Sequence, residues 1–455
     1  MAARATISPG KTLDEKAESR EHRLQVGRDR RERLSRSKLG ETTALKRSFH
    51  PIETLLEAGK GRVAALLPVK YSRMSVSPFA FFRGAVSIMA ADLANEPHTG
   101  LMVQLCGDAH VQNLGSFEGP DGRLVFDIND FDETIPGPWE WDVKRMAASI
   151  VLAGLESHHS RSACAGAVEA LAGTYCHLIE ELAEQPVLVA ARYQIHRVQR
   201  AQAVSAALQQ AARASSDDLL KKYTENGARG RAHFKRVEHV LWRLHGKRRQ
   251  EILESLPLYR QSLAPERLHL FDFFHPLDVA FKIVGTGSVG LRDYVVLMEG
   301  NGPGDPLFLQ IKQEVASAYA SCLKDTSYAH QGQRVAEGQR RVQPSSDLLL
   351  GWTRVGDHDF LVRQLNDHKG SVDLNRLRGD GLRSLSIVAG ELLARGHARS
   401  GDALTIKGYI GNCDKALKAI VKYGLDYAEA TQADYELFRR AIKEERVKIA
   451  GNAGS

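Results

Sequence analysis

The sequence predicts a mixed α+β protein in which a small antiparallel lobe of five strands is joined to a large helical lobe. Three observations lead to this prediction. Apolar residues alternate along several short segments within residues 271–370, as they do in half-buried strands. On both sides of this region they recur at helical spacing. The length of 455 residues allows a core large enough for two lobes without disulfide support.

Residues 1–50 are predicted to be a basic, disordered tail. They contain 13 Lys and Arg against 7 Asp and Glu, so this segment carries +6 of the total formal charge of +7. Its low apolar content leaves little surface to bury in a core. Because only the tail is basic, nucleic acid is an unlikely partner unless the tail itself binds it.

Residues 51–270 are predicted to form a helical lobe that contains a catalytic or metal-binding loop. SPFAFFRGAVSIMAADLANEP predicts an amphipathic helix over about residues 81–93, which ends before Pro97. Two short strands, LMVQLCGDAH and GRLVFDINDFDET, lead into a long helix that follows PGPWEWD. Residues 160–260 are helical in pattern.

Residues 271–370 contain the five predicted strands. DVAFKIVGTGSVGLRDYVVLMEG is predicted to be a strand, a glycine-rich turn and a second strand, and DPLFLQIKQE is a third strand. A helical insertion, QGQRVAEGQRRVQ, precedes the last two strands, DLLLGWTRV and DFLVRQLND. Residues 371–455 return to helical spacing and are predicted to complete the helical lobe.

Composition excludes several classes of protein. The five cysteines are scattered and form no CxxC pair, which argues against a zinc cage or a disulfide framework and favours a cytoplasmic location. No stretch of about 18 uncharged apolar residues is present, so we expect no membrane-spanning helix and no membrane partner. The N-terminal residues lack the apolar core of a signal peptide.

Residues 106–142, CGDAHVQNLGSFEGPDGRLVFDINDFDETIPGPWEWD, carry the strongest functional signal. They contain nine carboxylates and only one Lys or Arg, and carboxylates at this density repel one another unless a cation neutralises them. Asp108, Asn113 and Asp130 form a plausible oxygen-ligand set for Mg²⁺. A base, together with ligands for the ions that neutralise phosphates, is what phosphoryl transfer requires.

This segment resembles the catalytic core of aminoglycoside and choline kinases, a branch of the protein-kinase-like fold. GDAHVQN, DFDET and WEWD carry the resemblance, and Cys106 stands where that family usually has histidine. The resemblance implies that Asp108 is the catalytic aspartate and that Asn113 and Asp130 hold Mg²⁺. Asp127 is an alternative to Asp130. The same resemblance implies that Asp142 braces the catalytic loop from its helix.

The glycine-rich turn GTGSVG, residues 285–290, matches GxGxxG. The pattern is weak alone, but here it lies between strands and a third strand ends at Lys312, which resembles the nucleotide-covering arrangement of kinases. The resemblance implies that Lys312 pairs with the phosphates of ATP. It also implies that the backbone of the turn covers these phosphates, through Gly285, Gly287, Ser288 and Gly290.

A glutamate on a helix is expected to hold Lys312 in place. Glu337, in the helical insertion, is the first choice; Glu314 is the alternative, although it follows the lysine too closely in the sequence. The order of the parts is reversed relative to ordinary kinases, since the catalytic-like loop precedes the glycine-rich segment. The fold is therefore predicted to be a circularly permuted, two-lobed kinase-like fold. It requires Lys312 and Asp130 to lie close together across one cleft.

The chain beyond the tail also resembles a family of bacterial proteins of unknown function, the domain-of-unknown-function 2252 family. SPFAFFRG, CGDAHVQNLG, GTGSVGLRDY and GQRVAEGQRR carry this resemblance, which implies no activity. The expected function is ATP- and Mg²⁺-dependent phosphoryl transfer to a small-molecule hydroxyl or a protein. The alternatives are a metal-dependent phosphoesterase, whose further histidine ligands the sequence lacks, and a non-catalytic nucleotide-binding pseudokinase.

Overall fold

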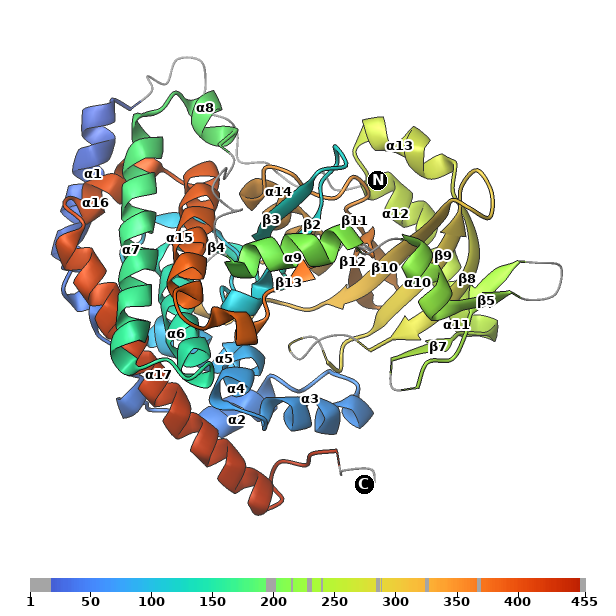
Figure 1. Ribbon diagram of the computed structural model, residues 1–455, viewed down its shortest axis with the longest axis horizontal. Coiled ribbons are helices and arrows are strands. Elements are labelled where there is room, and N and C mark those ends of the chain that lie inside the picture. Colours follow the sequence, from blue (N-terminus) through green and yellow to red (C-terminus); the bar gives the residue numbers. More distant parts are fainter. Residues whose placement is uncertain are drawn as a thin grey trace.

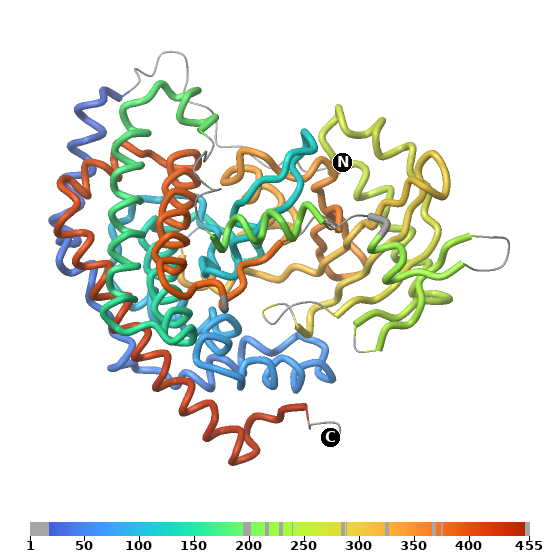
Figure 2. The backbone as a smooth tube through the Cα atoms, in the orientation of Figure 1, coloured from blue at the N-terminus to red at the C-terminus, as the bar shows by residue number. Residues whose placement is uncertain are grey.

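The protein is a mixed α+β molecule with several antiparallel sheets (Figures 1 and 2). The computed structural model describes residues 18–193, 202–213, 216–226, 231–238, 240–283, 287, 289–323, 327–365 and 370–450. A body of long helices lies on one side, a twisted six-stranded sheet lies on the other, and smaller sheets lie between them (Figure 1). No helix of the described residues combines the length and apolar character needed to cross a membrane.

Five helices form the centre of the helical body, and α15 packs along α7 while α17 packs along α6. They are α6 (Glu140–Glu156), α7 (Arg161–Glu184), α15 (Gly381–Ser400), α16 (Ala403–Ile410) and α17 (Asp414–Lys443). Helix α6 is buried along almost its whole length, so its charged residues must find partners inside the protein. Four shorter helices cover one end of this body (Figure 1): α2 (Pro51–Glu57), α3 (Leu67–Met74), α4 (Pro78–Gly84) and α5 (Val86–Asn95).

The six-stranded sheet is antiparallel throughout. Its order is β11 (Gly351–Val355), β12 (His358–Gln364), β10 (Pro306–Glu314), β9 (Asp293–Glu299), β8 (His275–Lys282) and β7 (Leu241–Arg243). The five predicted strands are present, but the prediction of a five-stranded lobe was wrong. Residues 241–243, within a segment of helical pattern, form a short edge strand because they pair with β8.

Alternation along the strands gives the sheet two different faces. Tyr294 and Val296 of β9 belong to one apolar cluster, whereas Val295 belongs to another. The first face is covered by α11 (Gly246–Glu254), α12 (Leu256–Ser262) and α13 (Pro265–Asp272). The second cluster includes residues from α10 (Ser216–Tyr223) and β6 (Ala232–Phe234), which pairs with β5 (Thr224–Asn226). The core of the sheet therefore includes residues that precede position 271.

Two small sheets and three further helices connect the two sides. β1 (Met102–Leu105) pairs with β4 (Ile135–Pro138), and β2 (Leu114–Glu118) lies between β3 (Leu124–Ile128) and β13 (Gly370–Ser371). The helices are α8 (Val187–Ala191), α9 (Gln202–Arg213) and α14 (Gln331–Val342). The small sheets therefore hold the acidic segment 106–142 at the junction of the molecule (Figure 1).

Part of the predicted tail is folded. Residues 20–33 form helix α1 (Arg20–Arg33), and the disorder predicted for residues 1–50 does not hold for them. Gly27 allows α1 to approach α16 closely, since a Cβ atom there would lie 2.0 Å from the Thr405 carbonyl oxygen. Arg31 donates hydrogen bonds to the carbonyls of Gly408 and Tyr409 at the end of α16. Arg31 of the basic segment therefore caps the C-terminal end of α16. The first 17 residues lie outside the described part.

Candidate functional site

A cavity of about 1430 Å³ lies between the sheet and the helical body. Three parts of the chain line it: the acidic segment, strands of the sheet, and the region of α2–α5. The predicted residues among its lining are Asp108, Asn113, Asp130, Gly287, Lys312 and Glu314. The cavity therefore brings residues of the acidic segment 106–142 together with residues of the glycine-rich turn and strand β10. Lys312 and Asp130 line the same cleft, as the permuted arrangement requires.

Lys312 reaches the cavity because of strand alternation. It lies on the same face of β10 as Phe308, opposite to Leu309 and Ile311, which pack into the other core. Its ammonium group forms an ion pair with the carboxylate of Asp132. Lys312 is only 5% exposed at its side chain, so this pair is strongly shielded from water.

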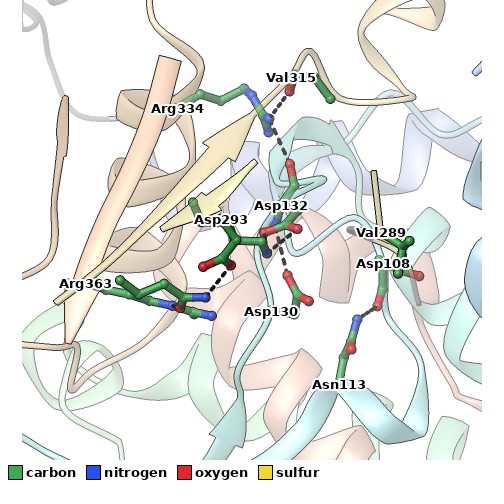
Figure 3. A network of polar contacts seen from close by, with 12 residues as sticks. Asp108, Asn113, Asp130, Asp132, Val289, Asp293, Val315, Arg334 and Arg363 are labelled. Atoms are coloured by element: carbon green, nitrogen blue, oxygen red, sulfur yellow. Dashed lines mark hydrogen bonds and ion pairs between the residues drawn. The ribbon is translucent and has the colours of Figure 1, made fainter. Parts of the chain in front are cut away.

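Asp130 and Asp132 form a close acidic pair (Figure 3), and Asp132 is the ion-pair partner of Lys312. The backbone N–H of Asp132 donates to Asp130 Oδ1 at 3.2 Å. Burial and the neighbouring charge of Asp132 raise the pKa of Asp130 to about 6. The ammonium of Lys312 lowers the pKa of Asp132 in spite of its burial. The two carboxylates therefore differ in acidity, and as the pH falls below neutral Asp130 takes up a proton before Asp132 does.

Asp108 and Asn113 lie at the other end of the acidic loop (Figure 3). Asn113 Nδ2 donates to the backbone carbonyl of Asp108 at 2.9 Å, which ties the two ends of the Asp-x4-Asn turn together. Arg145 of α6 forms an ion pair with Asp108 Oδ1 at 2.5 Å and is fully buried. His110 Nε2 lies 3.7 Å from the other oxygen, Oδ2. Because burial lowers the pKa of His110 to about 3, this ring is neutral.

Asp142 braces the loop that carries Asp108, as expected. Its carboxylate accepts hydrogen bonds from the backbone N–H groups of Cys106 at 2.8 Å and Gly107 at 3.0 Å. Gly107 has a φ of 86°, and a Cβ atom there would lie 2.2 Å from the carbonyl oxygen of Glu133. The position of Asp108 is therefore fixed by helix α6 and by a turn that requires glycine.

The described part of the glycine-rich turn is fastened to the helical body. Gly290 has a φ of 94°, and its carbonyl accepts a hydrogen bond from the backbone N–H of Val63 at 2.7 Å. Arg62 donates to the carbonyls of Gly287 at 2.9 Å and Val289 at 2.8 Å. Gly287 also lines the cavity. Two predicted residues of the turn, Gly285 and Ser288, lie outside the described residues.

The predicted partner of Lys312 differs from the one observed. Glu337 accepts a hydrogen bond from Gln333 on its own helix, α14, and Lys312 pairs with Asp132. Burial raises the pKa of Glu314 well above its usual value, so this cavity-lining side chain is a poor counter-ion. From α14, it is Arg334 that reaches the acidic loop, and it donates to the carbonyl of Asp132 in that loop and to the carbonyl of Val315 after β10 (Figure 3).

Asp127, the alternative to Asp130, occupies a different environment. It forms a buried ion pair with Arg395 of α15, and it is not among the residues that line the cavity. Asp127 lies within β3 and its side chain points to α15, whereas Asp130 lies in the loop after β3 and lines the cavity. Geometry therefore favours Asp130 over Asp127 as a ligand that a bound metal could reach.

One of the comparisons with known proteins assigns the chain to a family. Residues 62–441 match a family described as an uncharacterized protein conserved in bacteria, DUF2252. The chain belongs to the DUF2252 family. The comparisons with curated proteins and with solved structures found no significant match.

Several residues of this DUF2252 site were missed by the sequence analysis. Asp132 is the partner of Lys312, and its position two residues after Asp130 was the available signal. Lys70 and Arg334 come from helices outside the acidic segment: no motif marks Lys70, and the motif GQRVAEGQRR, which contains Arg334, gives no sign of its contact with the acidic segment. Arg145 lies on the helix that follows the acidic segment, and only the packing of that helix identifies it as the ion-pair partner of Asp108.

Oxygen-bearing side chains of this DUF2252 protein line the cavity without forming a complete metal site among the described residues. No group of three or more His, Cys, Asp or Glu side chains in the described residues is arranged to hold a metal ion. Mg²⁺ commonly uses one or two protein carboxylates and takes its other ligands from phosphates and water. Asp130 and the side-chain oxygen of Asn113, which both line the cavity, could supply such a partial site.

Proposed function

We propose that the protein is an ATP- and Mg²⁺-dependent phosphotransferase of kinase-like, circularly permuted architecture. The observation that carries this proposal is the shared cavity, where Lys312 of the sheet lies beside Asp130 and Asp132, and the Asp108–Asn113 turn lies on the same lining. A lysine, metal-binding carboxylates and a base in one cleft are the parts that phosphoryl transfer uses.

The topology of the sheet supports the proposal. The glycine-rich turn joins β8 to β9, and Lys312 lies on the next strand, β10. In kinases a glycine-rich loop likewise covers the phosphates, and the lysine lies on the third strand. Helix α14 follows β10 and packs against β12 and β11. The acidic loop comes from the segment that precedes this sheet in the sequence.

The lining of the cavity contains both an apolar group and a cationic group of residues. Apolar residues from the α10 region and from the ends of β8 and β12 line the cavity, and they are suited to a nucleobase. These residues are Leu219, Tyr223, Val240, Ile283 and Leu365. Lys282, Lys312 and Arg363 of the sheet also line the cavity and supply positive charge for phosphates. A nucleotide could therefore lie against the sheet with its phosphates near Lys312.

Asp108 is the base in this proposal. MgATP supplies the phosphoryl group, and the metal neutralises charge on its phosphates when it is bound. An acceptor hydroxyl gives its proton to the carboxylate of Asp108 as a new oxygen–phosphorus bond forms, and the bond from the γ-phosphorus to the leaving oxygen of ADP breaks. Arg145 and Asp142 hold Asp108 in place, so its carboxylate needs little reorganisation.

One observation favours a second candidate function. Arg145 engages Asp108 Oδ1 in an ion pair, so one oxygen of the proposed base is already occupied by a buried cation. A nucleotide-binding protein without phosphoryl transfer would be compatible with this arrangement. A phosphoesterase with its own preformed metal centre is less compatible, because no such ligand cluster occurs among the described residues.

The test is calorimetric titration with ATP and Mg²⁺ of the wild type, Lys312→Ala and Asp130→Ala. We expect the wild type to bind and each substitution to weaken binding at least tenfold, which is about 1.4 kcal/mol. Asp121→Ala, at an exposed aspartate of the same segment, is the matched control and should bind like the wild type. No binding by the folded wild type would refute the proposal.

Turnover separates the two candidates. ATP consumption should be measured with pools of small hydroxyl compounds as acceptors, using Asp108→Asn as the inactive control. Consumption that needs both an acceptor and Asp108 identifies a phosphotransferase. Nucleotide binding without any acceptor-dependent turnover identifies the non-catalytic alternative.

A further inference from the structure

Three cations without carboxylate partners line the helical side of the cavity. They are Arg62 after α2, Lys70 on α3 and Arg83 on α4. Among the described residues, none of the three forms an ion pair. The proposed nucleotide site uses a different group of cations, which come from the sheet. The cavity thus has two positively charged walls, with the acidic loop between them.

Lys70 is the most deeply buried of the three. It is 3% exposed, and no described residue lies within hydrogen-bonding distance of its ammonium. The two nearest acids are already engaged. Glu133 accepts a hydrogen bond from the backbone N–H of Ala318 at 2.6 Å, and Asp108 is paired with Arg145. Burial, and then the positive charge of Arg62, lower the pKa of Lys70 to about 7.

Arg62 precedes Lys70 in the sequence and Arg83 follows it, and each adds a positive charge that has no carboxylate partner among the described residues. Arg83 has a buried Nε that makes no hydrogen bond, and burial lowers the pKa of its guanidinium despite the nearby charge of Asp108. Arg62 donates only to backbone carbonyls of the glycine-rich turn. A buried cation without a counter-ion is costly, and an anionic ligand would remove that cost.

We propose that Arg62, Lys70 and Arg83 form a second anion site, which binds a phosphate group carried by the acceptor substrate. This inference rests on the proposed phosphotransferase function and specifies its substrate class. The charges of Asp108 and Glu133 act on Lys70, and that of Asp108 acts on Arg83, which places this site beside the proposed base. An acceptor held there by its phosphate would present a hydroxyl to Asp108.

The three positive charges of this site favour an anionic acceptor and disfavour a cationic one. Two arginines and a lysine favour a dianionic group, because they offer several charge-assisted hydrogen bonds to its oxygens. A cationic acceptor, such as a polyamine or an amino sugar, would face three positive charges that have no counter-ions. The proposed acceptor is therefore a small phosphorylated hydroxyl compound.

Pyridoxal 5′-phosphate is a probe for this site that does not depend on phosphoryl transfer. Its aldehyde condenses with a neutral lysine amine to give an imine and water, and borohydride reduces the imine to a stable secondary amine. We expect mass spectrometry to find Lys70 labelled at least tenfold faster than Lys60, an exposed lysine that pairs with Glu57. Inorganic phosphate should suppress labelling of Lys70, and pyridoxal without phosphate should label it at least tenfold more slowly.

Two further arms complete the test. Arg83→Gln keeps the lysine but removes one cation, so it should slow labelling of Lys70 while a thermal melt confirms that the variant is folded. A non-hydrolysable ATP analogue with Mg²⁺ should leave Lys70 open to the probe. Equal labelling by pyridoxal and its phosphate would overturn the anion site. Full protection by the ATP analogue would overturn its assignment to the acceptor and give these cations to the nucleotide.

The experiments distinguish a failure of the proposed phosphotransferase function from a failure of the anion site. Loss of the nucleotide site would appear in the calorimetric titration of the wild type with ATP, whereas labelling of Lys70 depends only on the anion site. A phosphate-selective Lys70 in a protein that binds no ATP would keep the anion site and overturn its role in holding an acceptor.

Discussion

Lys312 and Asp132 form an ion pair across the cavity, although 180 positions separate them in the sequence. Lys312 comes from strand β10 of the six-stranded sheet, and Asp132 comes from the loop after β3. Their pairing fastens the sheet to the acidic segment and holds the proposed phosphate-binding lysine next to the proposed metal ligand, Asp130. The pair therefore links the two parts of the site that the sequence presents separately.

Substitutions at Lys312 and Asp132 should have strongly non-additive effects on the free energy of unfolding. Lys312→Met leaves the carboxylate of Asp132 without its main counter-ion, and we expect the free energy of unfolding to fall by about 3–5 kcal/mol. Lys312→Met combined with Asp132→Asn should recover a large part of this loss. Urea denaturation of the wild type, both single variants and the double variant measures the coupling, and strictly additive effects would contradict it.

Asp130→Asn should stabilise the protein at neutral pH. The folded state raises the pKa of Asp130 from 3.8 to about 6, so ionisation above this range costs folding free energy. We expect the variant to be more stable than the wild type by roughly 1–3 kcal/mol at pH 7.5. The difference should shrink as the pH falls through 6 and vanish below 3.8, where the carboxyl is protonated in both states.

Chemical denaturation as a function of pH tests this prediction. Asp121→Asn is the matched control, because Asp121 is an exposed aspartate in the same segment, with 58% of its side chain accessible. Its effect should be small at every pH. A destabilised Asp130→Asn variant at pH 7.5 would show that the carboxylate is held by favourable contacts, contrary to the prediction.

Mg²⁺ should bind appreciably only together with ATP. The described residues offer no cluster of three or more acidic, His or Cys ligands, so the nucleotide must complete the coordination. Calorimetric titration of the protein with Mg²⁺ alone should give no saturable binding below millimolar concentration. The same titration with ATP present should show binding, which Asp130→Asn weakens. A tight site for Mg²⁺ without nucleotide would refute this expectation.

Gly27 should be essential for docking of helix α1. Gly27→Ala places a Cβ atom 2.0 Å from the Thr405 carbonyl oxygen, so α1 must move away from α16. We expect a loss of about 1–3 kcal/mol in unfolding free energy, as for an overpacked core. Gly166→Ala in helix α7 is the control, because a Cβ there meets no atom within 4 Å, and it should stabilise the protein by up to about 1 kcal/mol. Thermal melts compare the two variants.

The sequence by itself determined most of the local structure around the candidate site. Alternation marked the strands β8–β12, and the spacing of Asp108 and Asn113 marked a turn whose ends meet. The resemblance of WEWD to the kinase motif implied that Asp142 braces the loop, and its carboxylate accepts hydrogen bonds from the loop backbone. These features depend on residues close together in the chain, where periodicity and turn geometry limit the possibilities.

Tertiary structure alone decided which charges meet. It paired Lys312 with Asp132 in place of Glu337, buried Asp127 against Arg395 and left Lys70 unpaired in the cavity. It also added β7 to the sheet and folded α1 onto α16. The physical reason is the same in each case: the free energy of a buried charge or a strand edge depends on partners that are distant in the sequence, and local patterns carry no information about them.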